Sequence, residues 1–139
     1  MKTWRIIILI LAVLAVILVI APVSAGQKSG AGVTVPKYDP AAEATFKGTV
    51  EEVRDRECAM SGGMGSHLIL RLSDGNTIEV HLGSTKFVKA YDLLFNKGDV
   101  VSVLGMKVQF EGVETIFARE VTRGTDTFVF RDKDGAPVW

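Results

Sequence analysis

The sequence contains little cysteine and little histidine. Its 139 residues include one cysteine, Cys58, and two histidines. A single thiol cannot form a disulfide within the chain, and it excludes both a paired C-x-x-C and the haem-attachment pattern C-x-x-C-H. Cys58 is therefore a buried apolar residue, an intermolecular partner or a metal ligand.

The sequence also lacks an excess of positive charge. It has 16 basic and 16 acidic residues, and Lys2 and Arg5 are the only charged residues in the first 25. Without that segment, 14 basic residues stand against 16 acidic ones, a net charge of −2. Proteins that bind nucleic acid take much of their affinity from a basic face, so the composition argues against such a partner.

Residue patterns typical of catalysis are missing as well. Neither a Ser-His-Asp nor a Cys-His arrangement with an orienting partner occurs at a recognisable spacing. Gly62 and Gly63 precede a predicted strand, whereas a phosphate-binding glycine loop leads into a helix. Glu51 and Glu52 are neighbours on a strand and point to opposite faces, which is unsuitable for shared acid–base work. We expect that the protein is not an enzyme.

A long hydrophobic run is present at the N-terminus. After two basic residues, Ile6 to Ile20 is uninterrupted and apolar, Pro22 breaks the run, and small residues precede a possible cleavage point after Ala25. This is the layout of a secretory signal peptide, residues 1–25. The alternative is an uncleaved anchor, because a span needs roughly 20 apolar residues. Either interpretation predicts a periplasmic or secreted protein that meets a membrane only through this segment, if it stays uncleaved.

The remainder divides into a linker and one domain. Residues 26–39 are rich in Gly, Ser, Ala and Lys without apolar periodicity, which predicts a flexible linker. Residues 40–139 are enough for one small domain with a single core.

Apolar residues with a period of two, separated by glycine turns, predict a mostly β domain. Gly48, inside the first strand, predicts a bulge or a sharp coil there. The period changes to a helical one over Ser84–Phe95, where Ser84 or Thr85 can cap the start. The predicted strands are Ala44–Arg54, His67–Leu72, Thr77–Leu82, Val100–Phe110, Glu114–Thr122 and a short final pair, Thr127–Arg131 with Pro137–Trp139.

Three strands, a helix, two strands and a hairpin tail form the order of a five-stranded OB-type Greek-key barrel. The predicted fold class is therefore all-β with one helix, which lies between strands three and four. The tail, with Phe128, Phe130 and Trp139, is interpreted as a flap that closes one barrel end.

The chain also resembles a group of small secreted bacterial OB-fold domains, related in outline to the periplasmic bacterial OB-fold family. The resemblance lies in the segments FKGTVEEV, HLILRLSDGNTIEVHLG, KGDVVSVLGMKV and AREVTRGTDTFVFRDKDGAPVW, which cover most of residues 44–139. It implies a fold and a compartment, and it implies no catalytic residue.

The turn between the second and third strands decides how the two histidines are placed. Burial of one face allows two registers for this hairpin. A three-residue turn with Gly75 in the left-handed position pairs Leu72 with Asn76 and sets His67 directly opposite His81. The other register leaves the two histidines diagonal on the same face. Directly opposed residues have Cβ atoms roughly 4.5–5.5 Å apart, a separation at which two imidazoles can share one metal ion.

The stretch ECAMSGGMGSH, residues 57–67, holds the only other candidate ligands. Cys58, Met60 and Met64 are soft donors suited to Cu(I), and the stretch ends at His67. Methionine and cysteine are also ordinary apolar fillers, and three glycines predict a flexible loop in which ligation is costly. The stretch is interpreted first as a loop and second as part of a metal site.

These observations leave three functions open. The first is a non-enzymatic OB-fold binding module without a cofactor, whose small ligand or protein partner is unknown. The second is a protein that handles copper or zinc through His67, His81, Cys58, Met60 and Met64. The third is an adaptor for an oligosaccharide or a protein.

Overall fold

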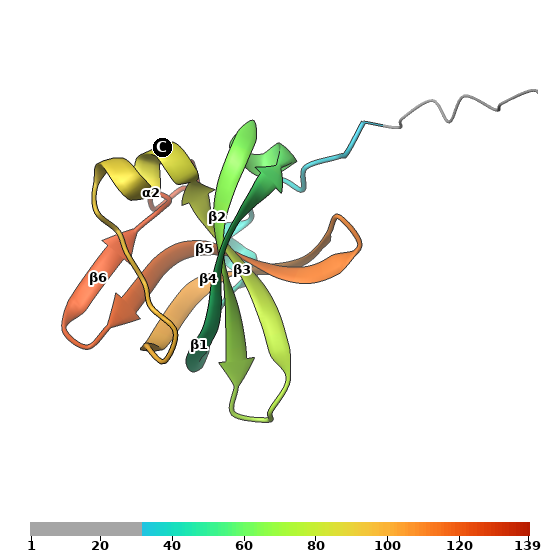
Figure 1. Ribbon diagram of the computed structural model, residues 1–139. Helices are drawn as coiled ribbons and strands as arrows, with labels where there is room; N and C mark the ends of the chain where they lie inside the picture. Colours follow the sequence, from blue (N-terminus) through green and yellow to red (C-terminus); the bar gives the residue numbers. More distant parts are fainter. Residues whose placement is uncertain (1–31) are drawn as a thin grey trace, which may run out of the picture. The chain divides into compact units, whose positions relative to one another are not determined.

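The computed structural model describes residues 32–139, so the predicted signal peptide or anchor and the first part of the linker lie outside the described residues. Within this part of the chain, no helix has the length and hydrophobicity that a membrane crossing requires. The fold is mostly β, with six strands, one α-helix and two 3₁₀ turns (Figure 1). The elements are η1 (Pro40–Ala42), β1 (Glu43–Cys58), η2 (Ala59–Ser61), β2 (Gly63–Leu72), β3 (Thr77–Ser84), α2 (Thr85–Ala90), β4 (Val100–Phe110), β5 (Val113–Arg123) and β6 (Asp126–Val129).

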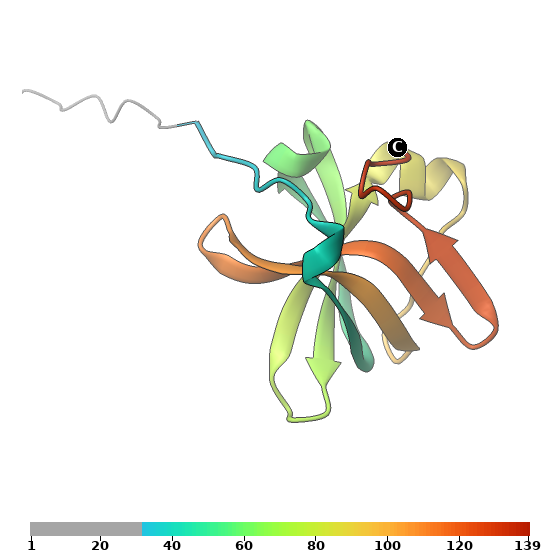
Figure 2. The same ribbon diagram turned by 180° about the vertical axis from the view of Figure 1, so that it is seen from behind.

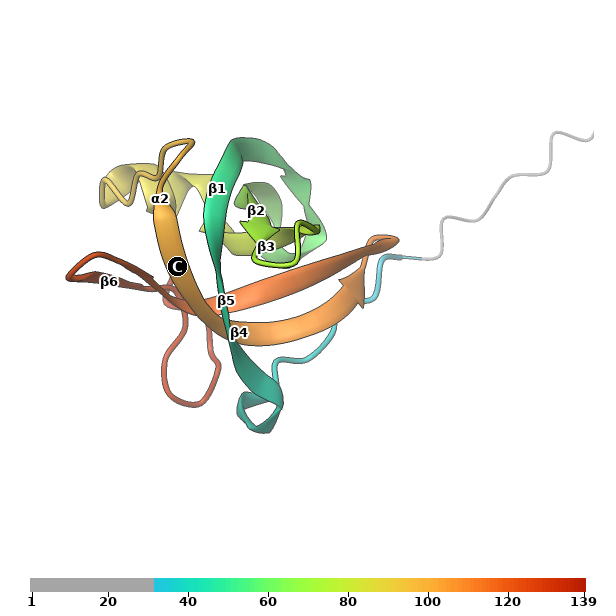
Figure 3. The ribbon, with the colours of Figure 1, turned by 90° about the horizontal axis from the view of Figure 1, so that it is seen from below.

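The six strands form one sheet in the order β3-β2-β1-β4-β5-β6. The first half of the long strand β1 pairs with β4 and its second half with β2, so β1 curves from one neighbour to the other (Figure 3). All neighbours in this order are antiparallel. A further, parallel pairing joins β3 to β5 through Glu79–His81 and Thr115–Phe117.

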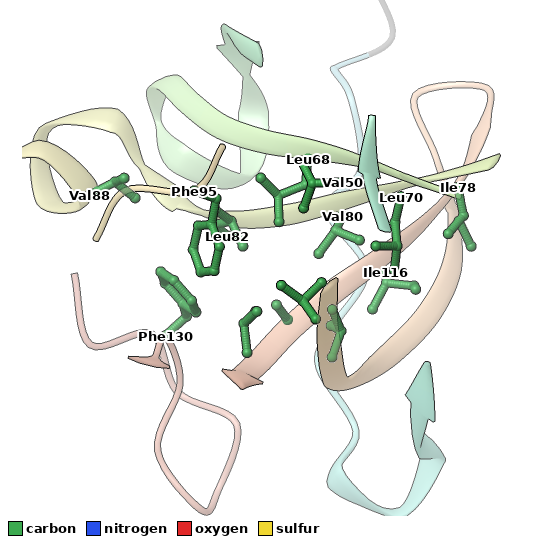
Figure 4. Close-up of a cluster of buried hydrophobic side chains, with 14 residues drawn as sticks. Val50, Leu68, Leu70, Ile78, Val80, Leu82, Val88, Phe95, Ile116 and Phe130 are labelled. Atoms are coloured by element: carbon green, nitrogen blue, oxygen red, sulfur yellow. The ribbon is translucent and has the colours of Figure 1, made fainter. Parts of the chain in front are cut away.

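The main core lies on one face of this sheet (Figure 4). Alternate residues of β2 and β3 supply it, since successive side chains of a strand point to opposite faces. Leu68 and Val80 oppose each other in the sheet and are both fully buried. The buried members are Val50, Leu68, Leu70, Ile78, Val80, Leu82, Val88, Phe95, Val101, Val103, Ile116, Ala118, Val121 and Phe130.

The hairpin between β2 and β3 has the register that places the histidines opposite each other. The Leu72 N–H donates to the Asn76 carbonyl at 2.8 Å, and Gly75 is left-handed with φ +84°. From this turn the pairing continues without a shift to His67 opposite His81. Of the two registers that the sequence allows, the structure has the one with direct opposition.

The stretch 57–67 differs from its prediction as a flexible loop. Strand β1 continues to Cys58, β2 begins at Gly63, and only the 3₁₀ turn η2 with Gly62 separates them. The two strands pair up to Cys58 and Gly63. Gly62 and Gly63 therefore lie in a tight hairpin. Backbone hydrogen bonds between β1 and β2 order the residues on either side of the turn, which the local sequence alone predicts to be flexible.

Two further predictions are corrected by the structure. The helix begins as predicted, with the Ser84 hydroxyl accepting the Phe87 N–H, but it ends at Ala90 because Asp92 adopts a left-handed φ of 52°. The irregularity of β1 lies between Val50 and Glu52 instead of at Gly48. Gly48 permits close strand contact, since a Cβ there would lie 2.3 Å from the Arg71 carbonyl oxygen.

The tail after β5 pairs first with β5 and then with itself. Strand β6 adds to β5, and the predicted final pair is reduced to one bridge between Arg131 and Pro137. The tail then returns toward α2, where Phe130 lies 6.5 Å from Phe87 between ring centres (Figure 2). Because Phe130 is fully buried in the main core, the tail is an integral part of the domain.

A second, smaller core forms apart from the main one. It includes Tyr38, which is buried, so the folded part begins two residues before the predicted boundary at residue 40. We call this group the second core. Its buried members are Tyr38, Cys58, Met106, Phe110 and Phe117, with Met60 and Val108 packed against them.

Candidate metal centre

The two histidines lie beside the second core. They occupy the face of β2 and β3 opposite to Leu68 and Val80, where a surface position would be expected from the hairpin alone. Both are nevertheless buried, His67 at 0% and His81 at 1% exposure. Their ring centres are 5.0 Å apart and their planes meet at 68°. The Phe117 ring of β5 lies 5.9 Å from His81, and the Trp139 ring of the tail lies 5.6 Å from it.

Each imidazole has one nitrogen in a hydrogen bond and one without a partner. His67 Nδ1 lies 3.1 Å from the Gly65 carbonyl oxygen, to which it donates, so its Nε2 carries the lone pair. His81 Nε2 lies 2.8 Å from the Ser61 hydroxyl oxygen, which can accept from it. His67 Nε2 and His81 Nδ1 are fully buried and have no hydrogen-bond partner among residues 32–139. Unpaired buried polar atoms are uncommon and call for an explanation.

The thiol of Cys58 completes a cluster of three. Cys58, His67 and His81 each offer one ligand atom, and these three atoms lie within 4.8 Å of one another. Ligands bound to one Zn²⁺ at about 2.0–2.3 Å in tetrahedral geometry are roughly 3.3–3.8 Å apart. Side-chain adjustments of about 1 Å would close the difference.

The turn η2 arranges several groups around this cluster. Cys58 immediately precedes the turn. The backbone N–H groups of Met60 and Ser61 donate hydrogen bonds to the Cys58 sulfur and so act to lower the pKa of the thiol. Ser61 binds His81, and Met60 packs against the second core. One short turn therefore supplies a thiol, a thioether and the hydroxyl that orients an imidazole.

Burial keeps all three ligands uncharged in the absence of a cation. Burial, the neighbouring His67 and the positive charge of Arg131 lower the pKa of His81 to about 3. The pKa of His67 is also lowered, mainly by burial, although the Glu79 carboxylate opposes this effect. Burial raises the pKa of the Cys58 thiol despite the two N–H groups. The cluster is thus two neutral imidazoles and one thiol.

A charged network borders the cluster. Arg56 forms ion pairs with Glu79 and Glu111. Glu79 Oε1 also lies 3.6 Å from His67 Nε2, too far for a hydrogen bond. The same carboxylate oxygen is paired with Arg56, so one positive charge already lies beside this edge of the imidazole.

A surface hollow reaches the thiol from outside. Its lining residues are Glu57, Cys58, Ala59, Gly63 and Glu111. Two of these residues are acidic, and one of them, Glu111, is paired with Arg56.

The structure separates the sequence-predicted ligands into two groups. Cys58, His67 and His81 converge, whereas Met60 packs against the second core, to which Cys58 belongs. Met64 is 48% exposed and sits across from Glu57, outside the buried cluster.

Several residues around the cluster were missed by sequence reasoning. Ser61, Glu79 and Arg131 lacked a motif that marks them, while Trp139 belongs to the tail that was interpreted only as a flap. Their roles arise from strand pairing and from the path of the tail, which local patterns do not reveal.

Comparison with known families gives one match. Residues 42–128, more than half of the chain, match the model of the MamS/MamX magnetosome protein family, and the chain belongs to that family. The matched segment contains Cys58, His67 and His81 and ends before Arg131 and Trp139. A comparison with curated proteins found no match.

Proposed function

We propose that this member of the MamS/MamX magnetosome protein family is a non-enzymatic transition-metal-binding module. Cys58 Sγ, His67 Nε2 and His81 Nδ1 hold one copper or zinc ion in the buried cluster. Thiolate and imidazole are the donors that both metals accept.

The observation that carries this proposal is the pair of unpartnered ring nitrogens. Metal-bound histidines almost always donate their other ring N–H to an oxygen, which fixes the tautomer and aims the free nitrogen at the metal. His67 does so to the Gly65 carbonyl, and the Ser61 hydroxyl oxygen, 2.8 Å from His81 Nε2, can accept in the same way. The nitrogens left over, on both rings, are those without a partner.

Binding also accounts for the thiol. Metal coordination requires the thiolate, so uptake releases the proton that burial holds on Cys58. The thiolate then offsets one positive charge of the ion. The Glu79 carboxylate, 3.6 Å from His67 Nε2, is already paired with Arg56 and is not counted in this charge balance.

The proposed scaffold is an OB-type barrel in which β1 to β5 form the barrel and β6 is an addition. The strand order and the parallel pairing of β3 with β5 support this assignment. The position of α2 between β3 and β4 supports it as well. The proposed location is outside the cytoplasm, which the N-terminal sequence pattern supports. The family's name contains the magnetosome, which is therefore the first compartment to test.

The test is metal binding by the purified full-length chain. Elemental analysis after incubation with Zn²⁺, or with Cu(I) under reducing conditions, should find one ion per chain. Cys58→Ser should lower the affinity for both ions by at least tenfold, since one of three protein ligands is lost. Cys58→Ser changes one atom at a buried site, and circular dichroism of the metal-free variant checks that the fold is kept.

Bound metal should also raise the melting temperature of the wild type, because a ligand that binds only the folded state stabilises it. Substoichiometric binding by the wild type, or equal affinity in Cys58→Ser, would refute the proposed function.

A further inference from the structure

Met60 is close in sequence to Cys58 but is not one of the three members of the cluster. It sits on η2, two residues after Cys58 and one before Ser61, and it packs against the second core. Its Sδ accepts a hydrogen bond from Arg131 Nη2 at 3.3 Å. A thioether is a weak acceptor, so this contact can be exchanged for a stronger bond at little cost.

Arg131 brings an unusual charge to this place. It is 3% exposed, and its guanidinium lies 4.8 Å from the Tyr38 ring centre and 5.0 Å from that of Trp139. Nη1 donates to the Gly135 carbonyl at 2.9 Å, whereas Nε has no partner. Among residues 32–139, no carboxylate forms an ion pair with it, so the positive charge is offset only by aromatic faces and dipoles.

The positive charge of Arg131 affects the binding of metal ions of different charge to different extents. A Cys58 thiolate with two neutral imidazoles and Cu(I) has no net charge, whereas the same ligands with Zn²⁺ carry one positive charge. The Arg131 guanidinium lies 5.9 Å from the Phe117 ring centre and 5.0 Å from that of Trp139, and both rings pack against His81, so its charge lies close to the cluster. A buried site near an unneutralised arginine favours the ion that adds no positive charge.

The donor types point to the same metal. Two histidines and a cysteine with a weak methionine ligand form a set that proteins use for copper. Zinc is held by cysteine, histidine and carboxylate and makes little use of a thioether.

Resting on the proposed function, we propose that the resident ion is copper and that Met60 Sδ is its fourth, weak ligand. On binding, Met60 leaves Arg131 Nη2 and turns its sulfur to the ion. The guanidinium keeps its bond to the Gly135 carbonyl and its aromatic neighbours. The site then contains two sulfur and two nitrogen donors.

The test compares two variants with the same change in composition. Met60→Leu removes the proposed ligand, and Met64→Leu makes the identical substitution at the half-exposed position outside the cluster. The affinity of the full-length chain for Cu(I) is measured by competition with a Cu(I) chelator, and that for Zn²⁺ with a Zn²⁺ indicator. Met60→Leu should weaken Cu(I) binding roughly tenfold, within the range produced by loss of a supporting interaction, and should leave Zn²⁺ affinity unchanged. Met64→Leu should change neither.

X-ray absorption of the Cu(I) protein provides a second readout. It should show two sulfur neighbours in the wild type and in Met64→Leu, and one in Met60→Leu. If Met60→Leu and Met64→Leu bind Cu(I) equally and show the same sulfur count, the fourth ligand is refuted while the three-ligand site stands. If the wild type binds neither ion, the proposed function itself fails, so the two failures are distinct.

Discussion

At the scale of single residues, the cost of burying His67 and His81 stands out. Each imidazole loses its water shell and gains only one hydrogen bond, so one nitrogen per ring remains unpaired. An apolar pair at these positions would avoid that cost. The unfavourable burial is understandable if the nitrogens serve a ligand that stabilises the folded state when it binds.

The first prediction at this scale concerns pH. The pKa of His81 is about 3 in the folded protein, below the ordinary value of 6.5, mainly because of burial. The unfolded chain therefore binds the proton more readily, and stability is full above about pH 6.5 and falls as the pH drops toward 3. Between pH 7 and pH 5 this single group should cost about 2 kcal/mol of unfolding free energy.

Urea unfolding of the chelator-treated wild type and of His81→Phe measures this cost, because phenylalanine does not titrate. The difference in unfolding free energy between the two proteins should shift by about 2 kcal/mol from pH 7 to pH 5. A constant difference across this range would show that His81 is not held neutral by the fold. Both proteins contain the same carboxylates, including Glu111, whose pKa is also lowered. Subtracting one unfolding free energy from the other therefore removes the carboxylates' contribution to the pH dependence.

At the scale of elements, the β2–β3 hairpin carries both histidines and determines that they face each other. Its turn depends on Gly75, whose φ of +84° is costly for residues with a Cβ. The hydrogen bond from Leu72 to Asn76 sets the pairing that continues to His67 and His81. A change of turn would therefore alter the metal site from a distance.

The prediction for this element is a pair of substitutions at Gly75. Gly75→Val should destabilise the protein by about 1 kcal/mol or more, because a β-branched residue is strained at positive φ. Gly75→Asn should cost less, since asparagine tolerates the left-handed region. Thermal unfolding of the metal-free proteins measures both. Equal melting temperatures for wild type and Gly75→Val would exclude the proposed role of the turn.

At the scale of the whole molecule, the sheet has a core on each face, and β5 contributes to both. Ile116 is buried in the main core, and its neighbour Phe117 is buried in the second core. Phe117 also lies against His81 and within 5.9 Å of the Arg131 guanidinium. The second core therefore forms the wall of the proposed metal centre, whereas the main core supports the fold from the other side.

The prediction at this scale is that neighbouring core substitutions have different effects. Ile116→Val should lower the unfolding free energy by about 0.5–1.5 kcal/mol and leave metal affinity unchanged. Phe117→Leu should destabilise the fold to a similar degree and also weaken metal binding severalfold, because His81 loses its support. Chemical unfolding and metal titration of the two variants test this. Equal metal affinity in both would show that the second core does not position the ligands.

The sequence alone determined the features that depend on near neighbours. Alternating apolar residues define β2 and β3 and place both histidines on one face, and the turn with a left-handed Gly75 is the one of two allowed registers that sets them opposite each other. Ser84 marks the start of α2 for a similarly local reason. Such features follow from a few consecutive residues, because strand periodicity, turn geometry and capping are local properties.

The tertiary structure decided whether these histidines are a site or a surface pair. Pairing of β1 with β2 brings Cys58 to them, β5 covers them with Phe117, and the tail adds Trp139. These contacts join residues far apart in the chain, and each depends on how the whole sheet curves and pairs. The tertiary structure also decided that Met64 is exposed and that Met60 packs against the second core. The two methionines belong to one short stretch and are equivalent until the fold gives them different surroundings.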